Sequence, residues 1–537
     1  MNQTRPEDRS KQSGLGGLGE ELAVYPATWA AERPDHPAVV MGATGENLTF
    51  RELDERSNQL ARLWRENGLD VGDHVAIFSE NQPRFFEVMW AALRSGLYVT
   101  TINSYLSSEE VAYILEDSGA KSLVTTTAKA ATAASALQEL RGIELPLLIG
   151  EQQAGFEPYA DAIGAMPVDP LDAEPAGELM LYSSGTTGRP KGIKRPLSGK
   201  RADEGMLIAG LVSGIFGMTG ETRYLSPAPL YHSAPIGFSL GVQSLGGTVV
   251  VMEKFDPLEA LRLIEHHDIT DSQWVPTMFV RMLKLDEAER TRFDVSSMRV
   301  AIHAAAPCPV EVKRRMIDWW GPVLWEYYAG TELNGFCLVR PEEWLERPGT
   351  VGQPLIGSLH IVGAEGEELP PGETGTVYFG GGPEYEYHNA PEKTAASKDP
   401  GGHGWTTLGD VGYVDDEGWL FLTDRQAFMI ISGGVNIYPQ EIEDCLTMHP
   451  KVADVAVFGI PDDEMGEAVQ AAIQPSAGVA GDDALASELR AYAREHIAHY
   501  KCPRGFEFHD QLPRLPTGKL YKHQLRARYW EGRTSSI

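Results

Sequence analysis

The sequence has few cysteines and no long apolar run. No two cysteines have CxxC spacing, and they stand far apart at Cys308, Cys337, Cys445 and Cys502. This spacing argues against a disulfide framework or a zinc site and favours a reducing compartment. The most apolar stretches, such as residues 206–218, contain glycine and are too short to span a bilayer. Residues 1–19 are polar and glycine-rich, so a disordered tail over residues 1–18 is expected rather than a signal peptide.

Basic charge is also scarce. There are 46 Lys and Arg residues against 76 Asp and Glu residues, which gives a formal net charge of -30. Such a surface repels nucleic acid and anionic lipid, and neither is an expected partner. A polyanionic substrate would need a locally basic or amide-lined pocket. The 42% hydrophobic and 23% charged content is typical of a soluble globular protein, and 537 residues exceed one ordinary domain. We therefore expect a soluble, cytoplasmic protein of two or more packed units.

Strand and helix patterns alternate in the first part of the chain. Thr49 with Glu52 and Ser107 with Glu110 form capping boxes, each of which begins a helix. Buried strands are predicted at residues 75–78, 98–102 and 122–124, and a helix at residues 84–94. The alternation returns at residues 248–252, 257–267, 272–275 and 298–302. This order predicts parallel, doubly wound sheets covered by helices on both faces.

The composition changes twice toward the C-terminus. After residue 350, Gly, Glu and Pro are frequent, and short β patterns at residues 360–362, 375–379 and 419–423 predict a small β-rich subdomain. After Asp424 the patterns predict helices at residues 439–448 and 483–496 and strands at residues 452–459 and 468–473. This last stretch, of about 110 residues, has the size of a small α+β domain.

A dense run of small and hydroxylated residues follows an apolar strand at residues 179–182. It contains Ser183, Ser184, Gly185, Thr186, Thr187, Gly188 and Lys191. Glycines let the backbone approach a ligand closely, and successive amides with hydroxyls form an anion-binding concavity. The run predicts a phosphate-binding loop to which Lys191 adds positive charge. It is not a loop of the Walker type, because Pro190 and Gly192 flank the lysine where that motif has Gly and Ser or Thr.

This loop resembles the phosphate-binding signature of the adenylate-forming superfamily, which includes acyl-CoA synthetases, peptide-synthetase adenylation domains and beetle luciferases. The resemblance covers residues 24–530. A second run is similar to the family's Tyr-Gly-x-Thr-Glu motif and comprises Glu326, Tyr327, Tyr328, Ala329, Gly330, Thr331 and Glu332. The resemblance implies that these residues bind ATP, with Tyr328 stacked against adenine and Thr331 on phosphate. It also implies that Glu332 and Thr187 hold Mg²⁺, which prefers one or two carboxylates with phosphate oxygens.

Further motifs follow in the family's order. The resemblance implies that Asp410 binds the ribose hydroxyls, since a carboxylate suits a vicinal diol, and that Arg425, in a hinge, also reaches the ribose. The loop at Ser432, Gly433 and Gly434 resembles the segment that lines the pantetheine tunnel. Lys519 resembles the family's catalytic lysine, which stabilises the charge that grows as the carboxylate attacks the α-phosphate.

The segment around His232 resembles the stretch that gates the carboxylate site, which makes this residue a catalytic candidate. A strand end of small residues, expected between adenine and the acyl group, comprises Ala305, Ala306 and Pro307. Tyr327 and Ala329 stand where many relatives have glycine, and their bulk predicts a short pocket for aromatic, compact cyclic or short-to-medium acids. Ala427 stands where the family's hinge often has Asp or Lys, so no side-chain latch is expected there.

Together these features predict an α/β protein with a large N-terminal body of two doubly wound sheets and a β-rich subdomain, hinged to a small α+β lid. The expected boundaries are residues 19–424 for the AMP- and acyl-binding body and residues 425–537 for the lid. The resemblance implies ATP-dependent acid–CoA ligation through an acyl-AMP, with ATP, Mg²⁺ and coenzyme A. It also implies a small carboxylic acid as substrate and a role in fatty acid or lipid metabolism.

Three alternatives remain open from the sequence. They are a stand-alone adenylation enzyme that loads a carrier protein, a monooxygenase of the luciferase type, and a non-catalytic acyl- or nucleotide-binding protein. The presence of Thr331, Glu332, Asp410 and Lys519 argues against the last of these. The identity of the acid and the formation of a homodimer are also left open.

Overall fold

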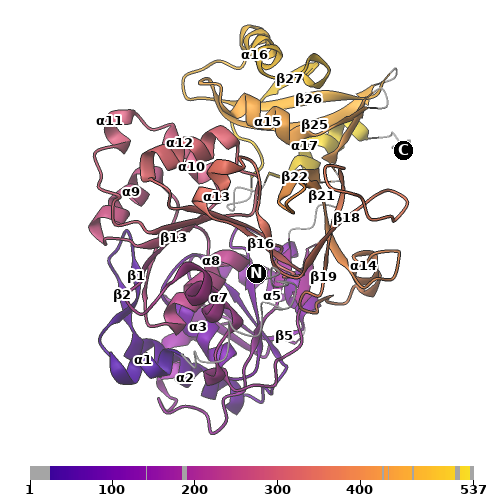
Figure 1. Cartoon of the computed structure of the whole chain (residues 1–537). Coiled ribbons are helices and arrows are strands. Elements are labelled where there is room, and N and C mark those ends of the chain that lie inside the picture. Colours follow the sequence, from indigo (N-terminus) through magenta and orange to yellow (C-terminus); the bar gives the residue numbers. More distant parts are fainter. Residues whose placement is uncertain are drawn as a thin grey trace, which may run out of the picture.

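The computed structural model describes residues 25–138, 140, 142–183, 190–425, 428–432, 435–462, 465–514 and 520–531. Two large sheets form the body of the described chain (Figure 1). One has nine strands in the order β17-β16-β15-β14-β13-β11-β12-β1-β2, and the other has six in the order β7-β6-β5-β3-β4-β8. The central pairs of the nine-stranded sheet are parallel, as are the pairs of the six-stranded sheet. Parallel strands joined by helices are the doubly wound arrangement that the sequence predicted.

The strands of these sheets are short. The nine-stranded sheet contains β1 (Pro37–Met41), β2 (Asn47–Thr49), β11 (Arg223–Ser226), β12 (Thr248–Val251), β13 (Asp271–Trp274), β14 (Val300–His303), β15 (Leu324–Tyr328), β16 (Phe336–Val339) and β17 (Gln353–Ile356). The six-stranded sheet contains β3 (His74–Phe78), β4 (Tyr98–Ile102), β5 (Ala120–Thr126), β6 (Leu145–Ile149), β7 (Glu157–Pro158) and β8 (Glu178–Leu179).

Helices fill the space between the two sheets and cover their outer faces. The inner helices are α2 (Phe50–Glu66), α3 (Arg84–Leu93), α7 (Leu207–Phe216) and α8 (Ser233–Ser244), and they share one apolar core with both sheets. A hydrogen bond of 2.7 Å from Trp90 Nε1 to Gln243 Oε1 joins α3 to α8 within this core. The outer helices are α4 (Ser108–Ser118) and α5 (Ala130–Gln138) on the smaller sheet, and α9 (Pro257–His266), α10 (Pro276–Leu283) and α12 (Val310–Trp320) on the larger one. Shorter helices are α1 (Pro26–Glu32), α6 (Tyr159–Gly164), α11 (Glu287–Arg290), α13 (Pro341–Glu346) and α14 (Pro391–Ala396).

Two smaller sheets adjoin this body. One has the order β20-β10-β9 and comprises β9 (Leu181–Ser183), β10 (Lys191–Lys194) and β20 (Glu386–Tyr387). The other has the order β18-β19-β21-β22 and comprises β18 (Ser358–Val362), β19 (Gly375–Gly380), β21 (Thr406–Val414) and β22 (Leu420–Arg425). The second of these corresponds to the β-rich part that the sequence predicted after residue 350.

The C-terminal residues form a separate α+β layer with its own apolar core. Its elements are β23 (Ile430–Ser432), β24 (Val435–Ile437), α15 (Pro439–Thr447), β25 (Val452–Asp462), β26 (Gly466–Pro475), α16 (Asp483–His496), β27 (Gly505–Phe508) and α17 (Lys522–Trp530). This layer lies at the top of Figure 1, next to β21 and β22. A large N-terminal body and a small C-terminal domain in a mixed α/β fold are therefore confirmed.

Local sequence signals account for many of the element boundaries. Thr49 and Glu52 form the predicted capping box at the start of α2, and Ser107 and Glu110 form the one at the start of α4. Helix α4 ends at Gly119, whose φ of 66° is readily adopted only by glycine. Strand β4 and helix α16 have the predicted bounds, and the other predicted elements are displaced by a few residues at most.

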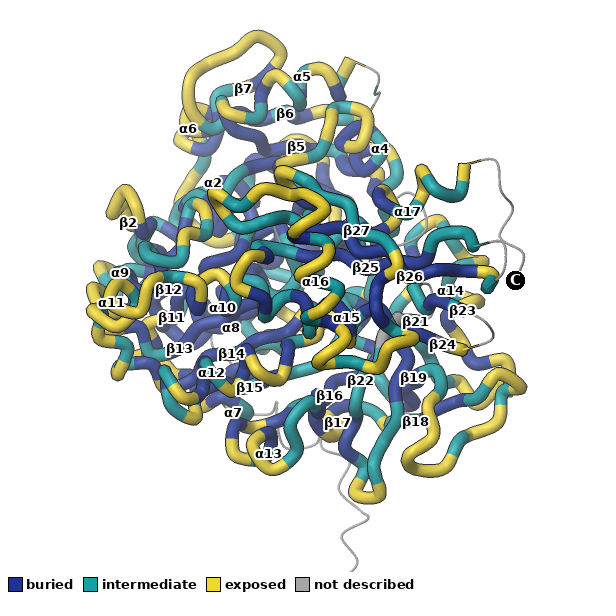
Figure 2. Tube along the Cα trace, turned by 90° about the horizontal axis from the view of Figure 1, so that it is seen from above, coloured by how far each residue is buried: buried dark blue, intermediate teal, exposed yellow. Residues whose placement is uncertain are grey.

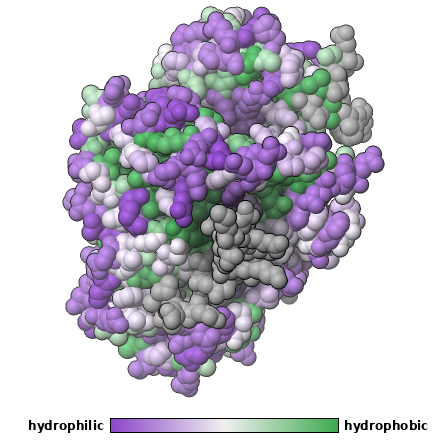
Figure 3. Space-filling view, in the orientation of Figure 1, coloured by the Kyte–Doolittle hydropathy of each residue, from purple (hydrophilic) through white to green (hydrophobic). Residues whose placement is uncertain are grey.

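Burial follows the layers. Figure 2 shows dark blue along the strands of the large sheets and yellow on the outer loops. On the face shown in Figure 3, hydrophilic residues cover most of the periphery and hydrophobic residues gather toward the middle. In the part of the chain that the structure describes, no helix is long and apolar enough to cross a membrane.

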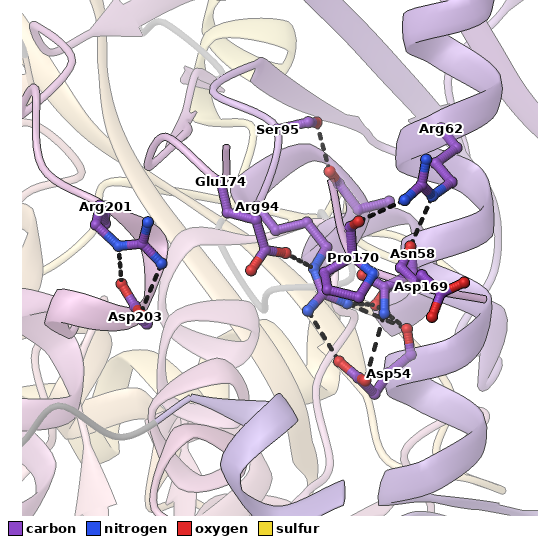
Figure 4. Close-up of polar contacts among 12 residues, drawn as sticks. Asp54, Asn58, Arg62, Arg94, Ser95, Asp169, Pro170, Glu174, Arg201 and Asp203 are labelled. Carbon is purple, nitrogen blue, oxygen red and sulfur yellow. Dashed lines mark hydrogen bonds and ion pairs between the residues drawn. The ribbon is translucent and has the colours of Figure 1, made fainter. Parts of the chain in front are cut away.

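A buried arginine anchors residues 165–177, the strap that leads from α6 into β8 (Figure 4). Arg94 donates to Glu174 Oε1 at 2.7 Å, to Asp54 Oδ1 at 2.8 Å and to Ser57 Oγ at 2.7 Å. Its guanidinium also lies 5.0 Å from the centre of the Tyr25 ring. These contacts connect α2, α3 and the strap, and the strap continues through β8 and β9 to the phosphate-binding run. Moving one partner away from a buried charge is costly, because the charge then lacks a hydrogen-bond or ion-pair partner in a place without water. The Arg94 contacts therefore fix the positions of α2, α3 and the segment before β8 relative to one another.

We expect Arg94→Ala to lower the free energy of unfolding by about 3–5 kcal/mol, since it leaves two carboxylates without their cation. Urea unfolding followed by tryptophan fluorescence measures this change. The control is Arg51→Ala, which removes an exposed pair with Asp35 and should cost less than about 1 kcal/mol. Equal losses for the two variants would contradict the role given to the buried cluster.

Candidate active site

The two ends of the phosphate-binding run meet across a strand pair. Ser183 on β9 lies opposite Lys191 on β10. The Lys191 ammonium lies 4.8 Å from the centre of the Tyr387 ring on β20. Burial and the neighbouring Lys393 lower the pKa of Lys191, while Glu332 opposes this shift. The structure therefore brings the lysine of the loop next to the carboxylate of a motif more than a hundred residues away.

Glu332 is held in a buried position. Its side chain is 8% exposed, and its Oε1 accepts a hydrogen bond of 2.8 Å from the Tyr387 hydroxyl. A Cβ at Gly330 would come within 2.7 Å of Glu332 Oε2 and 2.5 Å of a Leu408 methyl, so a larger residue there would displace the ends of these two side chains. Leu333, the next residue, has a φ of 55°, which is costly for a branched side chain.

The donor set at this position fits Mg²⁺ bound together with phosphates. Mg²⁺ takes one or two protein carboxylates and completes its shell with phosphate oxygens and water. Glu332 supplies one such carboxylate, and the second oxygen of this carboxylate is not the one that binds Tyr387. Within the described residues, no three His, Cys, Asp or Glu side chains form a set of metal ligands, so an all-protein metal cage is not present there.

Tyr328 and Asp410 lie side by side. The Tyr328 hydroxyl donates to Asp410 Oδ2 at 2.7 Å, although the two residues are 82 positions apart in the sequence. Asp410 is buried on β21, where its backbone pairs with that of Arg425 on β22. The Tyr328 ring lies 6.0 Å from that of Phe379. The aromatic side chain predicted for adenine and the carboxylate predicted for ribose are thus adjacent.

An aromatic cluster lies below α7 and α8. The Tyr327 ring stacks on Phe336 at 5.0 Å and lies 6.0 Å from Phe238, which belongs to α8. Burial raises the pKa of Tyr327. Ala329 packs against Leu211 of α7 and Phe336. The two positions that lack the family's glycine therefore contribute their side chains to a filled apolar region between the sheet and these helices.

His232 and the segment Ala305–Pro307 both lie at the end of an element, His232 before α8 and the segment after β14. His232 is the N-cap residue of α8, and its ring lies 4.3 Å from that of Tyr231. Ala305 follows β14 with a φ of 74°, which is strained for a residue with a Cβ. Ala306 is partly buried and Pro307 is exposed. Strained backbone of this kind is concentrated at binding sites.

The carboxylate of Glu326 contacts residues outside the predicted site. It accepts a hydrogen bond of 2.7 Å from Lys313 on α12, and His303 Nε2 lies 3.5 Å from the same oxygen. All three side chains are buried. Burial raises the pKa of Glu326 and Lys313 opposes this shift. Burial, the larger effect, also lowers the pKa of Lys313. The carboxylate is part of a buried ion pair rather than of a nucleotide-facing surface.

Several predicted residues lie outside the described residues. These are Ser184, Gly185, Thr186, Thr187, Gly188, Gly433, Gly434 and Lys519, together with the side chain of Arg425 and the hinge residue Ala427. Among the rest, Ser183 lies opposite Lys191, and Tyr387 contacts both Lys191 and Glu332. Gly330 lies beside Glu332, and the half-buried Thr331 immediately precedes it. Ser432 is a buried residue at the end of β23.

Sequence reasoning missed Tyr387 and the partners of Tyr327 and Glu326. Tyr387 belongs to a strand of two residues, which carries no periodic signal. Phe336 and Lys313 are ordinary members of a strand and a helix, and their importance follows only from what they touch. The alternation of Tyr385 and Tyr387 was the available signal, since buried tyrosines usually find a hydrogen-bond partner.

We expect Lys313→Met to lower the free energy of unfolding by about 3–5 kcal/mol at pH 8, because it leaves Glu326 charged and buried. The loss should be smaller at pH 5. The pKa of Glu326 is raised in the folded state, so its penalty is present at high pH and disappears as the carboxyl is protonated. Urea unfolding at both pH values measures this, with Lys451→Met in the half-exposed pair with Glu488 as the control. A loss independent of pH would contradict a charged buried Glu326.

The chain matches two family models. Residues 27–383 match the AMP-binding enzyme family, and residues 441–519 match the AMP-binding enzyme C-terminal domain. It is 34% identical to a feruloyl-CoA synthase of an Amycolatopsis species over 95% of this chain and 99% of the relative. It is 29% identical to a long-chain-fatty-acid–CoA ligase of Bacillus subtilis over 92% of both chains.

A solved structure of similar shape is the o-succinylbenzoate CoA synthetase of Bacillus subtilis in complex with its acyl-adenylate intermediate. It has a TM-score of 0.77 and 26% identity, over 95% of this chain and 99% of that one. The order of the motifs, the fold and these similarities agree. The chain belongs to the AMP-binding enzyme family, and it is an ATP-dependent acid–CoA ligase.

Proposed function

We propose that this ligase activates a compact aromatic or cyclic carboxylic acid. The observation that carries the proposal is the stack of Tyr327 on Phe336, closed on the α8 side by Phe238. These rings fill apolar space between the sheet and α7. A long, straight acyl chain that ran toward α7 would need this space. A rigid ring packs well against aromatic side chains, because offset and edge contacts add to the burial of apolar area.

Two of the similar proteins support this substrate class, and one does not. The feruloyl-CoA synthase and the o-succinylbenzoate CoA synthetase are named for ring-containing acids, whereas the Bacillus subtilis ligase is named for long-chain fatty acids. Steric exclusion from an apolar pocket is graded, since one methylene changes discrimination by at most about 1–3 kcal/mol. A preference among acids is therefore expected rather than absolute selection.

The reaction uses ATP, Mg²⁺ and coenzyme A. We assign adenine to the face of Tyr328 and the ribose hydroxyls to Asp410, because a hydrogen bond keeps these side chains adjacent. Glu332, with Thr331 beside it, is assigned to the phosphate side, where Mg²⁺ neutralises triphosphate charge when bound. Lys191 lies within reach of the same region. Lys519 is assigned to the charge that develops on the α-phosphate and the attacking carboxylate.

A mobile lid fits this two-step chemistry. We assign residues 19–424 to the body and residues 425–537 to the lid, with the hinge at Arg425. The backbone pairing of Asp410 with Arg425 supports this place for the hinge, because it connects the ribose candidate to the last strand before the C-terminal layer. Closure would exclude water from the acyl-AMP, which hydrolyses readily, until the CoA thiol attacks. The acidic surface and the scattered, unpaired cysteines support a cytoplasmic location.

A panel of carboxylic acids tests the proposed substrate class. Pyrophosphate release is measured with ferulate, benzoate, an o-succinylbenzoate and fatty acids of increasing length, each with and without coenzyme A, and acyl-CoA is identified by mass. We expect ring-containing acids to give the highest kcat/KM and acyl-CoA to form only when coenzyme A is present. Highest activity with palmitate would refute the substrate class without touching the ligase assignment.

We expect Glu332→Gln to raise the Mg²⁺ and ATP concentrations needed for half-maximal activity while leaving the fold intact. Tyr387→Phe should shift both in the same direction by a smaller factor, since it removes one neutral-donor hydrogen bond to the carboxylate, worth about 1.5–3 kcal/mol at most. Titrations of Mg²⁺ at fixed ATP measure both. Tyr159→Phe serves as the matched control, because it removes a tyrosine–carboxylate hydrogen bond of 2.9 Å to Glu87, outside the candidate site. An unchanged Mg²⁺ dependence in Glu332→Gln would remove it from the metal site.

We expect Tyr327→Gly to widen the acid pocket and to shift the preference toward longer acids. A series of fatty acids and aryl acids, assayed for kcat/KM in the unmodified protein and the variant, measures the shift. Removal of the ring also creates a cavity, so thermal unfolding is followed in parallel and a loss of a few kcal/mol is expected. A chain-length profile that does not move would show that the acyl group leaves the site in another direction.

A further inference from the structure

An open cavity of about 550 Å³ lies beside β10, β20 and α14, outside the residues assigned above to nucleotide or acid. Its lining residues are Lys194, Glu386, Tyr387, His388, Asn389, Ala390, Pro391, Thr394, Ala395 and Lys398. Tyr387 forms part of the wall and also donates its hydroxyl to Glu332. Tyr387 therefore contributes both to this cavity and to the position of Glu332 in the candidate active site.

Lysines continue from the active site to this cavity. Lys191 and Lys194 are three positions apart on β10, so their side chains point to opposite faces of the strand. Lys191 lies over the Tyr387 ring, and Lys194 lines the cavity. Lys393 on α14 is close enough to Lys191 to lower its pKa. Lys398 also lines the cavity. In a chain with a net charge of -30, such a concentration of cations marks a place for an anion.

The carboxylates near the cavity compensate this set only in part, because two lysines and one carboxylate are among the described lining residues. Glu386 is the one carboxylate among the described lining residues, and it is exposed opposite Lys194 on the neighbouring strand. Asp117 lies behind Asn389, where it accepts hydrogen bonds from Asn389 and from the Tyr182 hydroxyl. Glu332 lies on the other side of Tyr387. The cationic side chains therefore outnumber the carboxylates at the opening.

A buried imidazole lies behind the cavity wall. The His74 ring lies 5.7 Å from that of His388, which lines the cavity, and 4.7 Å from that of Tyr98. His74 is 8% exposed, and among the described residues its Nδ1 has no hydrogen-bond partner. Lys194 approaches the Tyr98 ring to 4.7 Å. A buried polar nitrogen without a partner costs free energy, and a bound polar ligand or a water that it orders would satisfy it.

We propose that this cavity binds a phosphate group of a reactant or product of the ligase reaction, held by Lys194 and Lys398. Two molecules of the reaction carry a suitable phosphate: the product pyrophosphate, which leaves when the acyl-AMP forms, and the reactant coenzyme A, through its 3′-phosphate. Both present the same multiply charged oxygens, for which lysine is a suitable point-charge partner. The site requires the ligase activity but not any particular acid, so it does not depend on the substrate class proposed above.

The test uses the full-length protein with Lys194→Ala and Lys398→Ala combined. Two quantities are measured with any acid that the enzyme accepts: the inhibition constant of added inorganic pyrophosphate, and the KM for coenzyme A relative to that for dephospho-coenzyme A. If pyrophosphate occupies the site, the inhibition constant rises about three- to tenfold, as expected for the loss of two partly exposed charge contacts, and the ratio of KM values stays unchanged. If the 3′-phosphate occupies it, the ratio, which is below one in the unmodified protein, rises toward one and pyrophosphate inhibition is unchanged.

Two comparisons separate a phosphate site from a general effect of charge. A double variant at exposed lysines elsewhere, Lys200→Ala with Lys254→Ala, removes the same charge and should change neither quantity. Lys194→Arg with Lys398→Arg keeps the charge and should restore most of the affected one. Failure of Lys194→Ala with Lys398→Ala to alter either quantity, or an equal change in the control variant, would overturn the proposal. Neither result would bear on the preference for ring-containing acids, which is read from the acid panel.

Discussion

The hydrogen bond between Tyr387 and Glu332 connects the segment after β15 to the small sheet β20-β10-β9. Glu332 follows the last parallel strand of the nine-stranded sheet, and Tyr387 belongs to the small sheet that carries both ends of the phosphate-binding run. The Lys191 ammonium lies over the tyrosine ring, and the same residue lines the cavity that contains Lys194 and Lys398. Because the carboxylate is buried, its position depends on a donor with fixed geometry. The metal candidate, the loop lysine and the cavity are therefore parts of one arrangement.

A second constraint is electrostatic. The protein carries a large negative charge, yet its reaction brings together ATP, a carboxylate and coenzyme A, all of which are anions. Attraction must therefore be local. Four lysines around β10 and α14 supply it, although Glu332 and Glu386 oppose them in part: Lys191, Lys194, Lys393 and Lys398. An acidic exterior repels other anions, and a basic recess would lower the free energy of a bound phosphate.

Buried ion pairs elsewhere keep the sheets and straps in register. Arg94 joins α2, α3 and the strap before β8, and Lys313 joins α12 to Glu326 in β15. Each pair bears on an element that leads directly into a motif, either the phosphate-binding run or the Tyr328 to Glu332 segment. Such pairs add little net stability, because burying the two charges costs desolvation free energy. An arrangement in which one charge loses its partner costs much more, so the native arrangement is favoured over similar ones. Their effect is on position.

The sequence by itself determined the elements whose signals are local. Thr49 with Glu52 and Ser107 with Glu110 specify helix starts through side chains three residues apart, and Gly119 specifies an end through its own backbone freedom. The order of strands and helices gave the fold class, and the motifs around Glu332 and Asp410 indicated the reaction before any contact was known. Tertiary structure decided what those residues touch. It paired Tyr328 with Asp410, gave Glu332 to Tyr387, and turned Glu326 away to Lys313. Such contacts join residues that are distant in sequence and depend on how sheets pack, and no local pattern encodes that packing.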